Sequence, residues 1–164
     1  LSLDNSKIKS DDLLSINISK SLVAWKNNKT EEAIRNLKRL LEESETTYLY
    51  ETLTSLLIVS NKIDDALTII NKGLNYNDSS DVLKSNFAEA NYLLGNYNVA
   101  EVKFKKLVDS NVSFMEPYYY LGLILLNNNE NDAALEILKK ATLFNDSLVS
   151  LVNCEKIKNL ITSI

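Results

Sequence analysis

The sequence predicts an all-α fold in which helical hairpins repeat along the chain, and three observations predict it. Four alanines recur at intervals of 33, 34 and 34 residues, at Ala33, Ala66, Ala100 and Ala134. Each alanine opens a stretch whose apolar residues stand three and four positions apart, which is one face of an α-helix. Only three glycines and one proline occur among 164 residues, fewer turn residues than a β-sandwich or barrel of this length needs. A fixed period of this length is typical of a solenoid of stacked repeats.

Each period divides into two helices joined by a short polar turn. The repeats cover about residues 13–45, 46–78, 79–112 and 113–146, and with one further helix they form a single domain over residues 11–164. We expect residues 1–10 to be a flexible N-terminal segment. The turns contain asparagine or glycine, which tolerate the left-handed backbone that ends a helix, at Asn28-Lys29, Asn61-Lys62, Gly95-Asn96 and Asn127 to Asn129.

A closing helix is predicted over residues 147–163. A solenoid needs such a helix, polar on its outer side, to cover the hydrophobic face of the last repeat. The apolar stripe that supports this helix consists of Leu148, Leu151, Val152, Leu160 and Ile161.

The repeats share a motif that is clearest in the fourth. It reads Tyr118-x2-Leu121-Gly122-x2-Leu125, followed by Ala134-x3-Leu138. The other three repeats align in the same register, the first least well, with Lys84 and Tyr50 at the place of Tyr118. This pattern resembles the W-x2-L-G-x2-Y and A-x3-F positions of the tetratricopeptide-repeat (TPR) family over about residues 13–145. The resemblance implies a right-handed TPR α-solenoid of four helical hairpins plus a C-terminal capping helix.

A second resemblance concerns small membrane-anchored TPR proteins of low-GC bacteria. In those proteins a short Ser-rich segment follows the last repeat, as Ser147-Leu148-Val149-Ser150 does here. The chain begins with Leu1 instead of Met, so a signal or anchor can have preceded it. Two locations therefore stay open, the cytoplasm and a membrane surface reached through such an N-terminal anchor.

Composition and charge argue against several classes of function. The net charge of −4 and the pI of about 5.0 are not those of a nucleic-acid-binding domain. The chain has no histidine and a single cysteine, and it lacks a phosphate-binding glycine loop, a zinc helix and a nucleophile elbow. Acid pairs such as Glu31-Glu32 and Asp64-Asp65 precede helices, where they favour the helix dipole. We therefore expect no enzyme, cofactor or metal site.

The TPR resemblance implies a binding groove on the concave face, which the first helix of each hairpin forms. Its acidic residues favour a neutral or basic peptide, and its tyrosines offer large contact areas with a polar end. An alternative is that some of these tyrosines fill gaps between hairpins. The residues that the resemblance places in the groove are Tyr48, Glu51, Thr52, Ser55, Ser85, Asn86, Glu89, Tyr92, Glu116, Tyr119, Tyr120 and Leu123.

Two functions follow from this interpretation. The first is a protein–protein interaction scaffold that binds a peptide or partner segment in the concave groove. The alternative is a structural subunit, or a self-associating component, of a larger assembly that can be membrane-associated. Lysines late in the second helices form a possible convex contact with an anionic membrane, although such runs are more often a solvated face. The identity of the partner and the oligomeric state are open.

Overall fold

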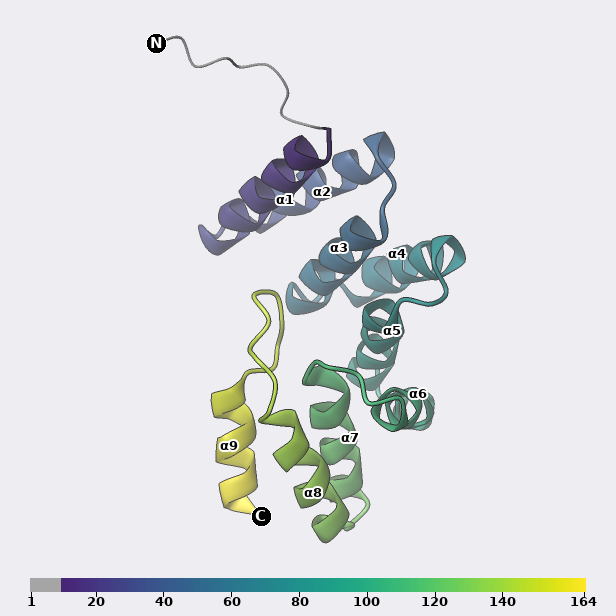
Figure 1. Ribbon diagram of the computed structural model, residues 1–164, viewed down its shortest axis with the longest axis vertical. Helices are drawn as coiled ribbons and strands as arrows, with labels where there is room; N and C mark the ends of the chain where they lie inside the picture. The colour runs from purple at the N-terminus through teal and green to yellow at the C-terminus, as the bar shows by residue number, and fades with distance from the viewer. Residues whose placement is uncertain (1–9) are drawn as a thin grey trace.

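The computed structural model describes residues 10–164, and within them it contains nine α-helices (Figure 1). Residues 1–9 of the predicted flexible segment lie outside this range, and Ser10 begins the first helix. The predicted all-α fold of four hairpins and a closing helix is confirmed. The helices are α1 (Ser10–Lys26), α2 (Thr30–Glu43), α3 (Thr47–Val59), α4 (Ile63–Tyr76), α5 (Asp81–Leu93), α6 (Tyr97–Asp109), α7 (Glu116–Asn127), α8 (Asn131–Ala141) and α9 (Cys154–Ser163).

The four turns inside the hairpins have the same backbone geometry. A residue with positive φ stands in each of them, and these residues follow one another at the period of the alanines. Three of the four are asparagine, which reaches this conformation at lower cost than most other residues with a side chain. The prediction from the Asn and Gly positions is confirmed at Asn28 (φ 61°), Asn61 (57°), Gly95 (82°) and Asn129 (64°).

The hairpins are closed by contacts between small and large side chains. Gly122 on α7 is the clearest case, because a Cβ atom there would lie 2.6 Å from Cγ of Leu138 on α8. The four period-defining alanines are fully buried, which explains why a larger side chain is absent from those positions.

The hydrophobic core has two parts that meet at α5. The first extends from α1 to α5 and is built from aliphatic residues such as Leu37, Leu53 and Ile70. The second extends from α5 to α9 and contains buried aromatic residues, including Phe104. α5 also carries half of the buried polar side chains of the described residues, namely Ser85, Asn86, Glu89 and Asn91, and its N-cap Ser80 is buried as well.

The closing helix is shorter than predicted. α9 begins at Cys154, and residues 145–153 form a loop instead of the start of a helix. Polar side chains explain the difference, because they bind backbone amides in a non-helical conformation. Asp146 accepts a hydrogen bond from the Cys154 amide, Ser150 from Val152, and Asn153 caps α9 by accepting from Lys156. α9 still covers the last repeat, since Ile157 is fully buried.

Figure 1 shows how this loop is placed. α1, α3 and α5 follow one side of the solenoid, and α2, α4 and α6 follow the other. The α8–α9 loop rises from the C-terminal end along the first side until it reaches α3. A segment from the end of the chain thereby lies beside helices from its first half.

Candidate binding groove

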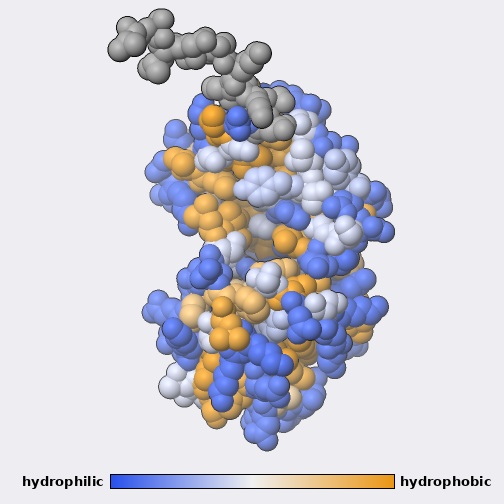
Figure 2. All heavy atoms as spheres, in the orientation of Figure 1, coloured by the Kyte–Doolittle hydropathy of each residue, from blue (hydrophilic) through white to orange (hydrophobic). Residues whose placement is uncertain are grey.

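The concave face contains two adjoining hollows between the first helices of the hairpins. The smaller, about 110 Å³, lies mainly along α3 and α5, and the larger, about 220 Å³, lies along α1 and α3. Ser55 and Val82 line both of them. Figure 2 shows the surface indented on this side of the molecule. The two hollows together are called the groove below.

The groove brings together eight of the twelve residues that the TPR resemblance places there. They differ widely in exposure, because some of them also pack between helices. Tyr48 is exposed, Glu51, Ser55 and Glu116 are half-buried, and the buried ones are Thr52, Ser85, Asn86 and Glu89.

The other four predicted residues lie elsewhere. Tyr92 and Leu123 line a separate hollow of about 220 Å³ at the turn end of α5, α6 and α7. Tyr119 and Tyr120 are only 5% and 3% exposed and belong to the aromatic part of the core. These two tyrosines therefore fill space between hairpins, as the alternative interpretation in the sequence analysis has it.

Hydrogen bonds across the groove join α3 to α5. Asn86 Nδ2 donates to Thr54 Oγ1 at 2.8 Å and to Ser55 Oγ at 3.1 Å. Ser80, the N-cap of α5, donates its hydroxyl to Glu51 Oε1 at 2.7 Å. Several polar groove residues thus hold neighbouring hairpins together as well as lining the groove.

Glu89 joins α5 to α7. Its Oε1 accepts a hydrogen bond from the Tyr120 hydroxyl at 2.7 Å. Burial raises the pKa of Glu89 from 4.5 to about 7, against the lowering effect of this hydrogen bond. The nearby Glu116 raises this pKa further and Lys156 lowers it. Burial and the Glu89 carboxyl together raise the pKa of Tyr120, so its hydroxyl stays protonated as the donor.

One polar atom in the groove has no partner. The hydroxyl of Ser85 is buried and makes no hydrogen bond within the structure described for residues 10–164. Ser85 lines the smaller hollow beside Asn86 and Glu89. A buried polar atom without a partner costs free energy, which a ligand that supplies a hydrogen bond would recover.

Part of the groove wall lies outside the twelve predicted residues. Phe114 and Val82 line it, and so do four residues of the α8–α9 loop, Ser147, Leu148, Val149 and Ser150. Val82 was detectable, since it stands one helical turn before Ser85 and Asn86. The loop residues were not, because they were assigned to the closing helix.

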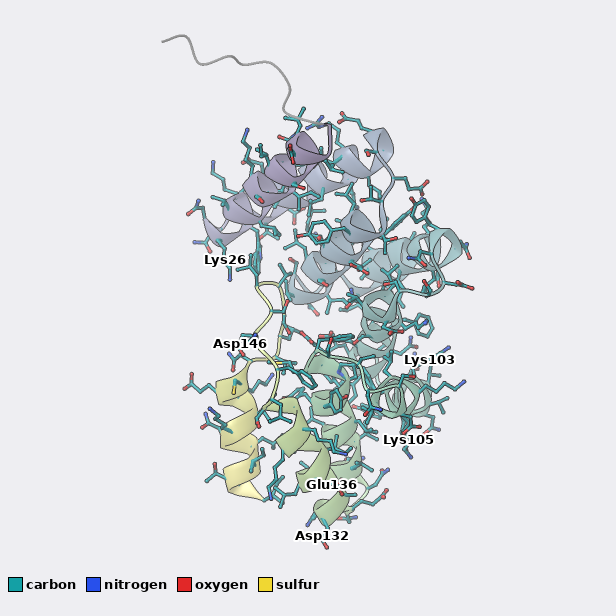
Figure 3. All side chains as sticks on the ribbon, viewed as in Figure 1. Lys26, Lys103, Lys105, Asp132, Glu136 and Asp146 are labelled. Carbon is teal, nitrogen blue, oxygen red and sulfur yellow. The ribbon has the colours of Figure 1, made fainter. Side chains whose placement is uncertain are left out.

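The convex side favours the solvated-face interpretation of its lysines. Lys103 and Lys105 lie on α6, away from Asp146 and the α8–α9 loop (Figure 3). Several convex lysines pair with acids, as in Lys38–Asp65 at 3.0 Å. Such exposed pairs contribute little to stability.

The described residues contain neither a metal-binding cluster nor a membrane-spanning helix. No group of three or more His, Cys, Asp or Glu side chains in residues 10–164 is arranged to hold a metal ion. Within the same range no helix has the length and apolar character needed to cross a bilayer.

The architecture just described is that of a TPR protein. No family model matches the chain, and no curated protein matches it in sequence. Solved structures do resemble it. The thermophilic TPR protein TTC0263 of Thermus thermophilus aligns with a TM-score of 0.72 and 15% identity, over 92% of this chain and 80% of that one.

MamA structures are also similar. MamA from residue 41 to its end, of Desulfovibrio magneticus RS-1, gives a TM-score of 0.63 at 19% identity, over 80% of this chain and 75% of that one. Another MamA crystal structure gives 0.62 at 13% identity, over 94% and 84% of the two chains. At these identities the likeness concerns the fold.

Proposed function

We propose that this protein is a scaffold that binds a peptide, or an extended segment of a partner protein, in its concave groove. The observation that carries the proposal is the groove itself, with the unpartnered Ser85 hydroxyl in its wall. Groups that lack a partner in the free protein are suited to a ligand that donates or accepts hydrogen bonds. The fold supports the same class of function, since solenoids present extended concave surfaces for binding.

The ligand should be neutral or basic. Glu51 and Glu116 line the groove beside Glu89, whose raised pKa of about 7 leaves it partly protonated, while none of the lining residues is a lysine or arginine. A strongly acidic segment would meet carboxylates of the same sign, which is unfavourable in a partly desolvated site.

A matched pair of arginine variants tests the site. Val82→Arg places a long cationic side chain in the groove, whereas Val102→Arg makes the same change at an exposed position on α6. Each full-length variant is used as bait in lysate of the source organism, after circular dichroism and thermal unfolding have shown that it is folded.

The proposal predicts that one lysate protein is captured by wild type and by Val102→Arg. The amount captured by Val82→Arg should be lower by about tenfold or more. A peptide scan of that protein should then yield a short segment that binds with the same dependence. Equal retention by both variants would exclude the groove as the binding site.

Self-association is a second candidate function, and the exposed face of α1 favours it. Ile16 and Val23 are 40% and 59% exposed, although the repeat alignment places them where α3 has the fully buried Leu49 and Leu56. α1 therefore presents a face that the preceding hairpin covers in the later repeats. This candidate predicts a dimer or larger species in light scattering that Val23→Lys converts to a monomer. A wild-type monomer at about 100 μM would contradict it.

A further inference from the structure

The α8–α9 loop forms one wall of the groove that the proposed function assigns to a partner. Val149 lines both hollows, and it packs against the aliphatic core of the first half of the chain. Ser147 also lines both hollows, Ser150 lines the smaller and Leu148 the larger. Four consecutive residues thus lie along the concave face of α3 and α5.

The loop is closed by bonds to its own end of the molecule. Asp146 accepts from the Cys154 amide at 2.7 Å, and Lys156 Nζ donates to the Leu151 carbonyl at 3.2 Å. These bonds anchor both ends of residues 147–150 next to α9. The segment is therefore present at the groove at a high effective concentration.

The contacts with the groove differ in kind from the hydrogen bonds that close the loop. Within residues 10–164 no hydrogen bond joins residues 147–150 to α3 or α5, so packing of Val149 is the main attachment. The Ser85 hydroxyl in the wall of the smaller hollow stays unpartnered, and Glu89 uses one carboxyl oxygen for Tyr120. The segment therefore covers part of the concave face without pairing the Ser85 hydroxyl, which makes it displaceable.

We propose that residues 147–150 are an internal ligand of the groove, and that the partner is an extended peptide that replaces them. This peptide places a small or β-branched aliphatic side chain at the position of Val149, between Ser55 and Val82. It also donates hydrogen bonds to groups that the internal segment leaves free, such as Ser85. The inference rests on the proposed function and deepens it, because it names the chemistry of the partner and the internal segment that the partner must displace.

The test uses a synthetic peptide as the probe. A fluorescent peptide of residues 145–152, with blocked ends, is titrated with the full chain and with an opened variant carrying Ser147→Gly, Leu148→Ser and Val149→Gly. Leu143→Ser is the control, because Leu143 belongs to the same connection, is 79% exposed and lines neither hollow.

The proposal predicts that the opened variant binds the peptide about tenfold or more tightly than wild type and the Leu143→Ser control. Adding Val82→Arg to the opened variant should remove this binding, and so should a peptide with the Val149→Asp change. Equal affinity of wild type and the opened variant, or unchanged binding of the altered peptide, would overturn the proposal.

Two further measurements keep the test decisive. If the opened variant does not fold, methyl NMR of the wild type answers the question: Val149 methyl groups should show contacts with Val82, and their absence would overturn the proposal. If the peptide fails to bind while a lysate partner still depends on Val82, the groove function stands and the internal ligand is excluded. If Val82→Arg changes neither the binding of the peptide nor the capture of the lysate partner, both proposals are wrong.

Discussion

The two faces of α5 use the same pair of repeat positions with different chemistry. In the repeat alignment Asn86 of α5 corresponds to Tyr120 of α7, and Ser55 of α3 corresponds to Glu89 of α5. Towards α3, Asn86 donates to Ser55 at 3.1 Å, and towards α7, Tyr120 donates to Glu89 at 2.7 Å. The Asn86–Ser55 pair is therefore neutral at any pH, whereas the Tyr120–Glu89 pair contains a buried carboxyl.

The comparison shows how a repeat protein can vary its groove without changing its fold. At both junctions a donor on one first helix binds an acceptor on the preceding first helix. In the repeat alignment the acceptor stands three positions after the donor. The Asn–Ser pair is small and leaves a hollow beside it, with Ser85 unpartnered. The Tyr–Glu pair is surrounded by aromatic rings, with Tyr120 stacked on Phe104 at a centroid distance of 5.5 Å. The groove therefore opens on the α3–α5 side.

The largest expected difference between the two interfaces is the pH dependence of stability that Glu89 causes. Below pH 4.5 the carboxyl is protonated in both the folded and the unfolded chain, so its contribution to stability is fully present. As pH rises towards the folded-state pKa of about 7, the unfolded chain releases this proton first, and the free energy of unfolding falls by about 3 kcal/mol.

The Glu89→Gln variant isolates this effect, because its amide is neutral throughout. Urea unfolding from pH 4 to pH 8 should show Glu89→Gln gaining stability relative to wild type as pH rises, with most of the gain between pH 4.5 and 7. Parallel stability curves for the two proteins would mean that Glu89 is ionised in the folded state with an ordinary pKa.

A smaller effect on stability is expected at the neutral Asn86–Ser55 pair. Asn86→Ala removes the hydrogen bonds to Thr54 and Ser55, which should cost about 1–2 kcal/mol in urea unfolding. The loss should be the same at pH 5 and pH 8, in contrast to the Glu89 interface. A loss that changes between these pH values by as much as the Glu89 effect would show that the two interfaces are coupled.

Local signals in the sequence predicted the hairpins and their turns. Asn28, Asn61, Gly95 and Asn129 are at positions where the backbone must be left-handed, and this preference depends on the residue itself. The alanine period depends on the close contact inside each hairpin, which every repeat forms again. These parts of the fold needed no knowledge of distant contacts.

The groove could be predicted only in part, for two physical reasons. Tyr119 and Tyr120 follow the concave register, but their burial depends on how α7 packs against α5 and α9, which the repeat pattern does not contain. The loop over 145–153 has helix-compatible apolar spacing, yet Asp146, Ser150 and Asn153 bind backbone amides and favour a loop. Its place against α3 is a long-range contact without a sequence signal.

The central claim is that the groove is a binding site which the chain's own loop partly covers. The most direct measurement is the affinity of the captured partner's peptide for wild type, the opened variant, Val82→Arg and Val102→Arg, determined by fluorescence anisotropy at one pH and salt concentration. We predict that the opened variant binds about tenfold more tightly than wild type, that Val102→Arg equals wild type, and that Val82→Arg binds most weakly. Equal affinities across all four proteins would contradict the account.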